Sequence, residues 1–238
     1  MAKSGMSSRV AARDADSSRS AGTRRQLVAA AVETLKAEGF AGTSARAIAE
    51  RAGVNQGLIF YHFGSVADLL LAALDSVSDQ RMEQYGAAVD GIGSPSELVD
   101  VAMAIFREDL DSGHVTVLVE MIAGAASTPG LGSEVSARLG PWFAFAEHAL
   151  EHTVGGSPLG SLLPLRDVAY GVVALYLGLE MLTHLDGNPS RALALFDHAK
   201  SLPGLLDALG SPPPQGKPCS APPPPCRRPG GPTPGSTW

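Results

Sequence analysis

The stretch GTSARAIAERAGVNQGLIFYHF, residues 42–63, decides the fold, because it predicts two short helices joined by a tight turn. Ser44 can cap the first helix, since its hydroxyl can accept a hydrogen bond from a backbone N–H of the next turn. Gly53 suits the left-handed residue that ends a helix, and Asn55 suits the cap of a second helix over residues 56–63. A helix, a glycine-containing turn and a second helix with polar tips is the pattern that reads a DNA major groove.

The same stretch resembles the N-terminal signature of the TetR family of transcriptional regulators. The shared positions, in the expected order and spacing, are Thr43-Ser44, Ile48-Ala49, Ala52-Gly53-Val54, Gly57 and His62-Phe63. Two positions depart from the family: Phe60 stands where Tyr is frequent, and Val66 stands where Lys is common. A hydroxyl and a cation that would hold phosphate are therefore missing, which bears on DNA affinity and not on the fold.

Composition places the chain among globular proteins, with 238 residues of which 45% are hydrophobic and 18% charged. No run of 18 apolar residues without charge occurs and the N-terminus lacks an apolar signal core, so we expect no membrane span and a cytoplasmic location. The two cysteines, Cys219 and Cys226, lie in a Pro-rich tail, which argues against a disulfide framework.

Charge is distributed unevenly along the chain. The net charge is −6, yet residues 1–64 hold nine Lys and Arg against five Asp and Glu. Residues 65–238 hold nine against nineteen. A basic N-terminal segment on an acidic remainder is typical of a protein whose one end meets nucleic acid, although an uneven solvated surface would give the same counts.

We predict an all-α fold with an N-terminal helix-turn-helix domain over 22–64, its motif at 44–63, and a larger helical ligand-binding and dimerisation domain over 65–210. Residues 1–21 and the Pro-rich residues 211–238 are expected to be disordered. Arg9, Arg13 and Arg19 of the first segment could follow DNA phosphates, or belong to a loose solvated tail.

Apolar periodicity, caps and breakers set the expected helices. The first runs over Thr23–Glu38, with Thr23 as cap and Gly39 as stop; the next begins after Gly64-Ser65 and runs to about Tyr85, and another, capped by Ser94 or Ser96, runs to about Leu110. The later helices are His114–Ala126, Leu131–Val154 with a possible kink at Gly140-Pro141, Arg166–Leu185, and Ser190–Ala208 interrupted by Pro203-Gly204. Gly155–Pro164 is expected as loop. The helix Arg166–Leu185 has an apolar stripe on one side and the small residues Gly171, Ala174 and Gly178 on another, so we expect it to be buried on two faces. The resemblance implies that the last two helices form a four-helix bundle with a second copy.

Nine residues are candidate contacts to a double-stranded DNA operator: Thr43, Ser44, Arg46, Asn55, Gln56, Gly57, Phe60, Tyr61 and His62. Gln56 begins the second helix, where its amide can pair with adenine. Thr43, Ser44 and Arg46 begin the first helix, where backbone N–H groups and a cation favour phosphate. His62 could instead be a structural hydrogen-bonding residue.

The resemblance implies a small-molecule ligand among the central helices that moves the helix after the motif. Our candidates are large, adaptable side chains, namely Met103, Phe106, Met121, Trp142, Phe143, Phe145, Tyr176 and Met181. For any one of them taken alone, core packing is the better explanation, since apolar stripes are mainly core. His114, His148 and Glu180 could orient such a ligand.

One catalytic signature needs weighing, because His148 to His152 match H-x-x-E-H, an inverted zinc-protease pattern. Five residues match by chance often, and no context supplies a third ligand. We therefore predict no catalytic residue, no metal and no cofactor. The favoured function is a homodimeric, ligand-released repressor, and the alternative is a helical ligand- or protein-binding module with weak DNA affinity.

Overall fold

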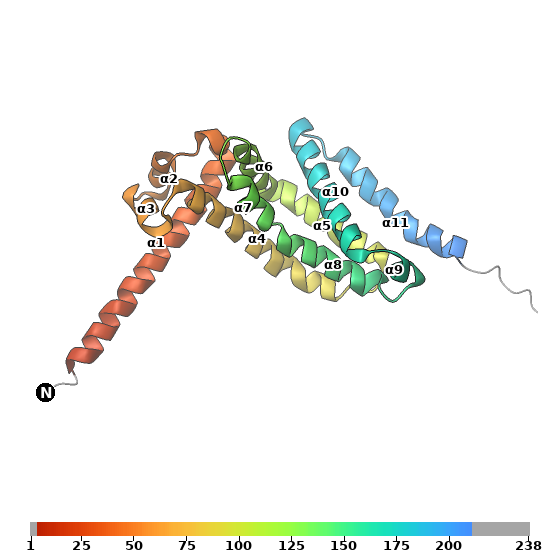
Figure 1. Cartoon of the computed structure of the whole chain (residues 1–238), viewed down its shortest axis with the longest axis horizontal. Helices are drawn as coiled ribbons and strands as arrows, with labels where there is room; N and C mark the ends of the chain where they lie inside the picture. The colour runs from red at the N-terminus through yellow and green to blue at the C-terminus, as the bar shows by residue number, and fades with distance from the viewer. Residues whose placement is uncertain (1–3, 211–238) are drawn as a thin grey trace, which may run out of the picture.

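The computed structural model describes the chain over residues 4–210, and its side chains there except over 4–16, 158–159 and 202–210. This described part is all helical, without a strand, which confirms the predicted fold class. The head consists of α1 (Ser4–Gly42), α2 (Ala45–Ala52) and α3 (Gly57–Phe63). α4 (Val66–Asp90) leaves the head and runs into the body, which extends away from it (Figure 1).

The body contains α4 and the helices that follow it. They are α5 (Pro95–Ser112), α6 (His114–Ala125), α7 (Leu131–Ala137), α8 (Gly140–Val154), α9 (Pro158–Leu162), α10 (Leu165–Asp186) and α11 (Ser190–Gly210). In Figure 1, α6 and α7 lie next to the head, whereas α10 and α11 lie on the far side of the body.

One apolar core joins the head to the near part of the body. Leu35 from α1, Ile48 from α2 and Ile59 from α3 are fully buried, and they share a cluster with Leu69 of α4 and Met121 of α6. Each buried side chain of this size contributes about 1.5–3 kcal/mol. The head is therefore packed onto α4 and α6, so a movement of α4 would move the reading helices.

The N-terminal segment is helical where we expected disorder. α1 begins at Ser4, well before the predicted start at Thr23, and the Thr23 hydroxyl donates to the Arg19 carbonyl inside the helix at 3.1 Å. The segment has no proline and is rich in Ser, Ala and Arg, so the helix nucleated by the buried part of α1 can extend backwards. Gly39 ends regular helix as predicted, with φ 67° and ψ 178°.

Three boundaries in the body also differ from expectation. The predicted helix Leu131–Val154 is two helices, and the break falls just before Gly140-Pro141, where proline suits a helix start. Part of the predicted loop 155–164 forms the short α9. α11 continues through Pro203-Gly204, where an interruption was predicted. The tail 211–238, with Cys219 and Cys226, lies outside the described residues.

Candidate nucleic-acid interface

The turn between α2 and α3 is fixed by caps at both ends. The Ala47 N–H donates to Ser44 Oγ at 3.1 Å, which confirms Ser44 as the cap of α2. Gly53 adopts φ 65° and ψ 31°, and its N–H closes the helix onto backbone carbonyls. A side chain is strained at that positive φ, so Gly53 sets the angle between the two helices.

The start of α3 is held by Asn55. Its Oδ1 accepts from the Gly57 N–H at 2.7 Å, while the Leu58 N–H donates to the Asn55 carbonyl at 3.0 Å. Gln56 already has helical dihedral angles, although α3 is assigned from Gly57. Asn55 therefore acts as the predicted cap, and its amide oxygen is occupied by the backbone.

The outer side of α3 carries the exposed polar and aromatic groups. Gln56 is exposed, Phe60 is 51% exposed and Tyr61 is 79% exposed, whereas Ile59 is fully buried. His62 is half-buried and meets the Tyr61 ring edge-on at 4.9 Å between centroids. α3 thus presents Gln56, Phe60 and Tyr61 outward on a rigid helix, as a groove-reading surface requires.

The candidates on α2 are already engaged with neighbouring groups. Arg46 Nε donates to Glu50 Oε1 at 2.9 Å, and both side chains are exposed. The hydrogen bond to Glu50, followed by the negative charge of that residue, raises the pKa of Arg46. Thr43 Oγ1 donates to the Gly39 carbonyl at 2.6 Å, so Thr43 holds the loop before α2. Arg46 is an exposed cation that an incoming phosphate can take from Glu50.

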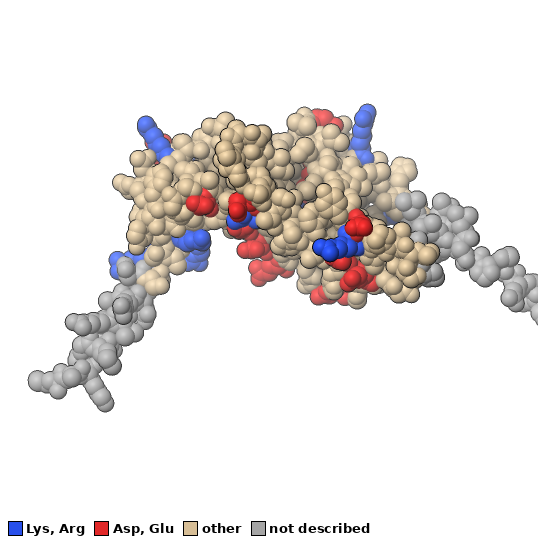
Figure 2. Space-filling model, viewed as in Figure 1, with Lys and Arg blue, Asp and Glu red and all other residues tan. Residues whose placement is uncertain are grey.

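The sequence analysis missed two contacts from α1 to the reading pair. Arg24 lies over the Phe63 ring of α3 at 4.8 Å from its centroid, and Gln26 Nε2 donates to the Ala52 carbonyl at 2.7 Å. Both residues lie in a polar stretch of α1 with no turn or motif signal to mark them. In Figure 2, Lys and Arg appear at the head beside the N-terminal helix, whereas acidic residues gather along the lower edge of the body.

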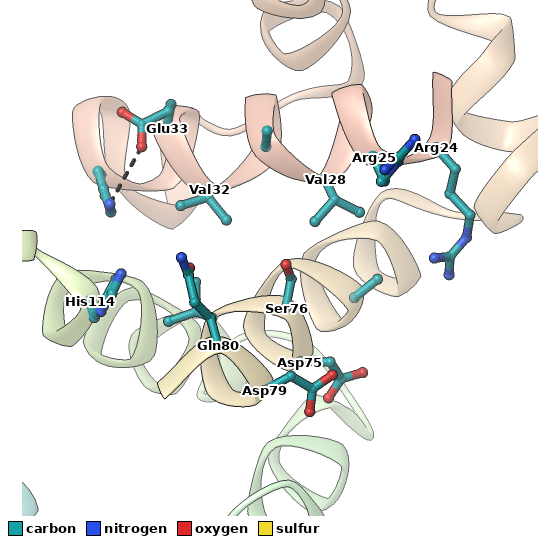
Figure 3. A pocket seen from close by; sticks show the side chains of 14 residues that line it. Arg24, Arg25, Val28, Val32, Glu33, Asp75, Ser76, Asp79, Gln80 and His114 are labelled. Atoms are coloured by element: carbon teal, nitrogen blue, oxygen red, sulfur yellow. Dashed lines mark hydrogen bonds and ion pairs between the residues drawn. The ribbon is translucent and has the colours of Figure 1, made fainter. Parts of the chain in front are cut away.

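The structure does not bring the ligand candidates into one open cavity. Phe106 and Met121 are fully buried, and Met103 is nearly so. A cavity of about 770 Å³ lies instead between α1 and α4; none of the eight large candidates lines it, whereas His114, a candidate for orienting the ligand, does. Figure 3 shows Val28 and Val32 of α1 facing Ser76 and Gln80 of α4 across this space, with His114 at one end and Arg24 at the other.

Three candidates nevertheless surround a buried charged cluster in the body. Arg81 pairs with Asp109, and the Tyr176 hydroxyl donates to Asp109 Oδ2 at 2.7 Å. The Phe106 ring meets Tyr176 edge-on at 5.8 Å, and the Arg81 guanidinium lies 4.4 Å from the Trp142 ring centroid. Sequence reasoning suggested Glu180 for this region but missed Arg81 and Asp109, which look like ordinary surface charges in a helical pattern.

The H-x-x-E-H segment lies on α8. His148 Nε2 is 3.2 Å from Asp90 Oδ1, and the His148 and His152 rings stack at 6.3 Å. Over the residues that the structure places, no group of three or more His, Cys, Asp and Glu side chains could hold a metal ion.

α10 is more exposed than we expected. Gly171 and Ala174 are exposed, and Leu175 and Leu182 of the apolar stripe are 56% and 63% exposed. A Cβ added at Gly171 would meet nothing within 4 Å. The prediction of burial on two faces is therefore wrong for the single chain, because the face is left uncovered. α10 is also long and apolar enough to cross a membrane, with a mean hydropathy of 1.5, though a single helix of this kind is weak support for a span.

A capped helix, a left-handed glycine turn and a second helix with exposed side chains, mounted on an all-α body, define a DNA-binding protein of the helix-turn-helix class. The family model described as bacterial regulatory proteins of the tetR family matches residues 27–73, which cover α2, α3 and parts of α1 and α4. Over these residues the chain has the N-terminal DNA-binding domain of the TetR family of transcriptional regulators.

Sequence relatives match part of the chain. An uncharacterised HTH-type transcriptional regulator of Mycobacterium tuberculosis is 28% identical over 122 residues, which is 51% of this chain and 63% of the relative. The regulator TtgR of Pseudomonas putida is 34% identical over 91 residues, 36% of this chain and 42% of that protein. The matches thus span less than two thirds of these curated relatives.

Solved structures share the fold over most of the chain. A TetR-family regulator from Rhodococcus sp. superposes with a TM-score of 0.64 at 20% identity, covering 76% of this chain and 98% of that one. GusR of Salmonella enterica gives a TM-score of 0.62 at 19% identity, covering 79% and 95%. At these identities the likeness concerns the fold.

Proposed function

We propose that this regulator is a homodimeric repressor that binds a DNA operator through α3 and leaves it when a small molecule binds the body. The observation that carries the proposal is the exposed face of α3, where Gln56, Phe60 and Tyr61 point away from a head whose core is fully packed. Exposed aromatic side chains on a rigid, capped helix are otherwise costly to leave in water, and a major groove would cover them.

Within this proposal the nine candidate residues divide by role. Gln56 reads a base edge, and Phe60 offers apolar contact to a thymine methyl group. Arg46, with Tyr61, holds phosphates. The remaining residues contribute mainly by positioning the backbone that meets the DNA. The side-chain oxygens of Asn55, Ser44 and Thr43 are hydrogen-bonded within the head, and Gly57 has no side chain. His62 supports Tyr61 from the side.

A second copy of the chain is our proposed cover for α10. The exposed apolar groups there include Val172, Leu175, Leu182 and Leu185, and the small residues Gly171 and Ala174 allow a partner helix to approach closely. A helix-turn-helix reader also gains from two heads, because half-sites repeat about 34–36 Å apart on one side of a duplex. We propose cytoplasmic action without catalysis, metal or cofactor.

The alternative is a helical ligand- or protein-binding module with weak DNA affinity. It is favoured by Phe60 and Val66, which lack the phosphate-binding groups frequent in the family, and by Arg46, which is paired with Glu50. Fluorescence anisotropy separates the repressor from this alternative. The full chain is titrated into a labelled duplex from the promoter of its own gene and, in parallel, into a scrambled duplex. Preferential, salt-sensitive binding supports the repressor, whereas equal and weak binding to both duplexes supports the alternative.

A further inference from the structure

Six buried polar atoms in the described part of the body lack a hydrogen-bond partner. One, Arg138 Nε, lies 2.8 Å from the Asp75 carboxylate as an ion pair. The other five are Arg81 Nε, the Tyr85 hydroxyl, Asp109 Oδ1, His114 Nδ1 and Glu180 Oε1. They come from four helices, α4, α5, α6 and α10, and so converge from across the fold. Native proteins leave few buried polar groups unpaired, because each one keeps its full desolvation cost. So many in one place indicate a site that something else completes.

The charges of this cluster do not balance. The carboxyl of Asp109 is fully buried and that of Glu180 is 2% exposed, yet Arg81 is the cation that both of them face. Arg81 bonds to Asp109, and it stays 3.9 Å from Glu180 Oε1. Burial, followed by the negative charge of Asp109, raises the pKa of Glu180 well above its usual range. The raised pKa favours a proton on Glu180, and such a proton would offset part of the excess negative charge of the cluster.

Aromatic rings surround these charges. Trp142 lies against the Arg81 guanidinium, and Tyr176 contacts both Asp109 and the ring of Phe106. Ring faces attract cations and repel anions. An anion would also meet two carboxyl groups, so the surroundings select for positive charge.

His114 connects this cluster to open space. It lines the cavity of about 770 Å³ between α1 and α4, and Figure 3 shows it at one end of that cavity. Its Nδ1 is 3.9 Å from Asp109 Oδ1, and neither atom has a hydrogen-bond partner. The imidazole therefore lies between the cavity and an unpaired carboxylate oxygen. The cavity lining carries charges of both signs, from Arg24, Arg25 and Lys36 and from Glu33, Asp75 and Asp79. The Lys36 ammonium group is held by Glu33 and the Ser112 carbonyl.

We propose that this cluster binds the ammonium group of a small organic cation, whose N–H groups donate to Asp109 Oδ1 and Glu180 Oε1 while the rest of the molecule occupies the cavity beside His114. The proposal rests on the proposed ligand-responsive function and adds to it the charge class of the ligand. One N–H donor reaches each unpaired carboxyl oxygen, and one positive charge balances the second carboxylate.

The same contact gives the ligand a route to the head. Arg81 belongs to α4, which shares a core with α1 and α3, and its pairing with Asp109 ties α4 to α5. An ammonium group on Asp109 Oδ1 lies beside the Arg81 guanidinium on Oδ2 of the same carboxylate, and the two positive charges repel. The ligand therefore binds best when the tie between α4 and α5 is loosened, and this difference in affinity is what shifts the head.

The test is isothermal titration of the full chain with three compounds of similar shape and different charge: benzylamine, benzyl alcohol and benzoate. We expect benzylamine to bind tightest of the three. Glu180→Gln keeps the shape of the side chain and removes its charge, and it should weaken benzylamine about tenfold or more. Asp111→Asn is the matched control, because Asp111 is an exposed carboxyl on the helix that carries Asp109. It should leave affinity unchanged.

Several results would overturn the inference: no binding of benzylamine, equal binding of benzyl alcohol or benzoate, or unaltered benzylamine affinity in a folded Glu180→Gln variant. Promoter anisotropy with each compound keeps the two proposals apart. If a neutral or anionic compound alone releases the DNA, the ligand-released repressor stands and the cation site fails. If benzylamine binds through Glu180 but leaves DNA affinity unchanged, the site stands and ligand release through it fails.

Discussion

The backbone N–H of Phe40, at the end of the head's first helix, donates to Glu120 Oε2 on α6 at 2.7 Å. This bond joins two segments eighty residues apart in the chain and spans the junction between head and body. Because Gly39 has left helical geometry, the Phe40 N–H has no helical carbonyl partner, and the carboxylate supplies one. The orientation of the head therefore depends on a side chain of the body.

Removing this acceptor should weaken both stability and DNA binding. Glu120→Ala leaves a half-buried N–H unpaired, for which we expect a loss of about 1–3 kcal/mol in the free energy of unfolding. Glu120→Gln keeps an oxygen acceptor and should lose less. Urea denaturation of both variants checks the order. Glu83→Gln, at an exposed carboxyl of α4, is the control. If it lowers the free energy of unfolding as much as Glu120→Ala does, the role of the Phe40–Glu120 bond is contradicted.

The Phe40 ring makes a second prediction at the same junction. A Cβ added at Gly124 of α6 would lie 2.4 Å from atoms of that ring, so even alanine requires the ring, or the helices that carry the two residues, to shift. We expect Gly124→Ala to destabilise the protein by about 1–3 kcal/mol through overpacking. Combining it with Phe40→Leu should recover part of the loss in thermal denaturation. A strictly additive double variant would contradict direct contact.

Arg46 and Gln56 should differ in kind when each is replaced by alanine. Arg46→Ala removes a phosphate cation, so binding should weaken on every duplex and the slope of log affinity against log salt should fall by about one. Gln56→Ala should cost about 1–3 kcal/mol at one base pair and leave the slope unchanged. Anisotropy titrations on a set of single-substitution duplexes measure both. Uniform loss on all duplexes for Gln56→Ala would remove its base-reading role.

Much of the head could be predicted from sequence because its signals are local. The caps Ser44 and Asn55 and the glycine turn at Gly53 each act within a few residues, and all three have the expected geometry. The reach of α1 back to Ser4 was missed, since polar Ala- and Arg-rich sequence does not distinguish a solvated helix from a disordered arm.

The body's buried cluster could not be predicted, for a different physical reason. Arg81, Asp109 and Glu180 come together only through the packing of α4, α5 and α10, and each has ordinary charged neighbours in sequence. A charged residue on a helix is normally solvated, so periodicity gives no sign that these three are buried. The exposure of α10 was misjudged likewise, because an apolar stripe does not say whether its cover is the same chain or another.

The free energy of unfolding should depend on pH through Glu180. Its pKa is raised in the folded protein above the usual value of 4.5, chiefly by burial, so the folded state holds a proton that the unfolded chain has released. This stabilisation is complete below the unfolded pKa and is lost as pH rises through the folded pKa. Glu180→Gln does not titrate and has no such pH-dependent contribution. The Tm of the variant minus the Tm of the wild type should therefore increase as pH rises.

The neighbouring His114 works in the opposite direction. Burial lowers its pKa from 6.5, so its contribution is present above that value and is lost as pH falls. His114 is present in both the wild type and Glu180→Gln, so its contribution cancels when their Tm values are subtracted at each pH. A Tm difference that stays constant from acid to alkaline buffer would contradict a raised pKa at Glu180.

Dimer formation should depend on the exposed stripe of α10. Leu182→Glu places a charge in the proposed contact, and we expect the molar mass from sedimentation equilibrium to fall from dimer to monomer. Leu162→Glu is the control, because Leu162 is also exposed but lies on α9. A wild type that is monomeric, or that partitions into lipid vesicles, would show that something other than a second copy covers α10.

The central claim is that two copies of this chain insert α3 into one operator. The most direct measurement is sedimentation of the full chain with a fluorescent promoter duplex, followed at rising salt. The account predicts one complex containing two chains per duplex, lost steeply as salt increases and weakened by Gln56→Ala on that duplex alone. A protein that stays off the duplex at low salt, or that binds it no better than a scrambled sequence, would contradict the account.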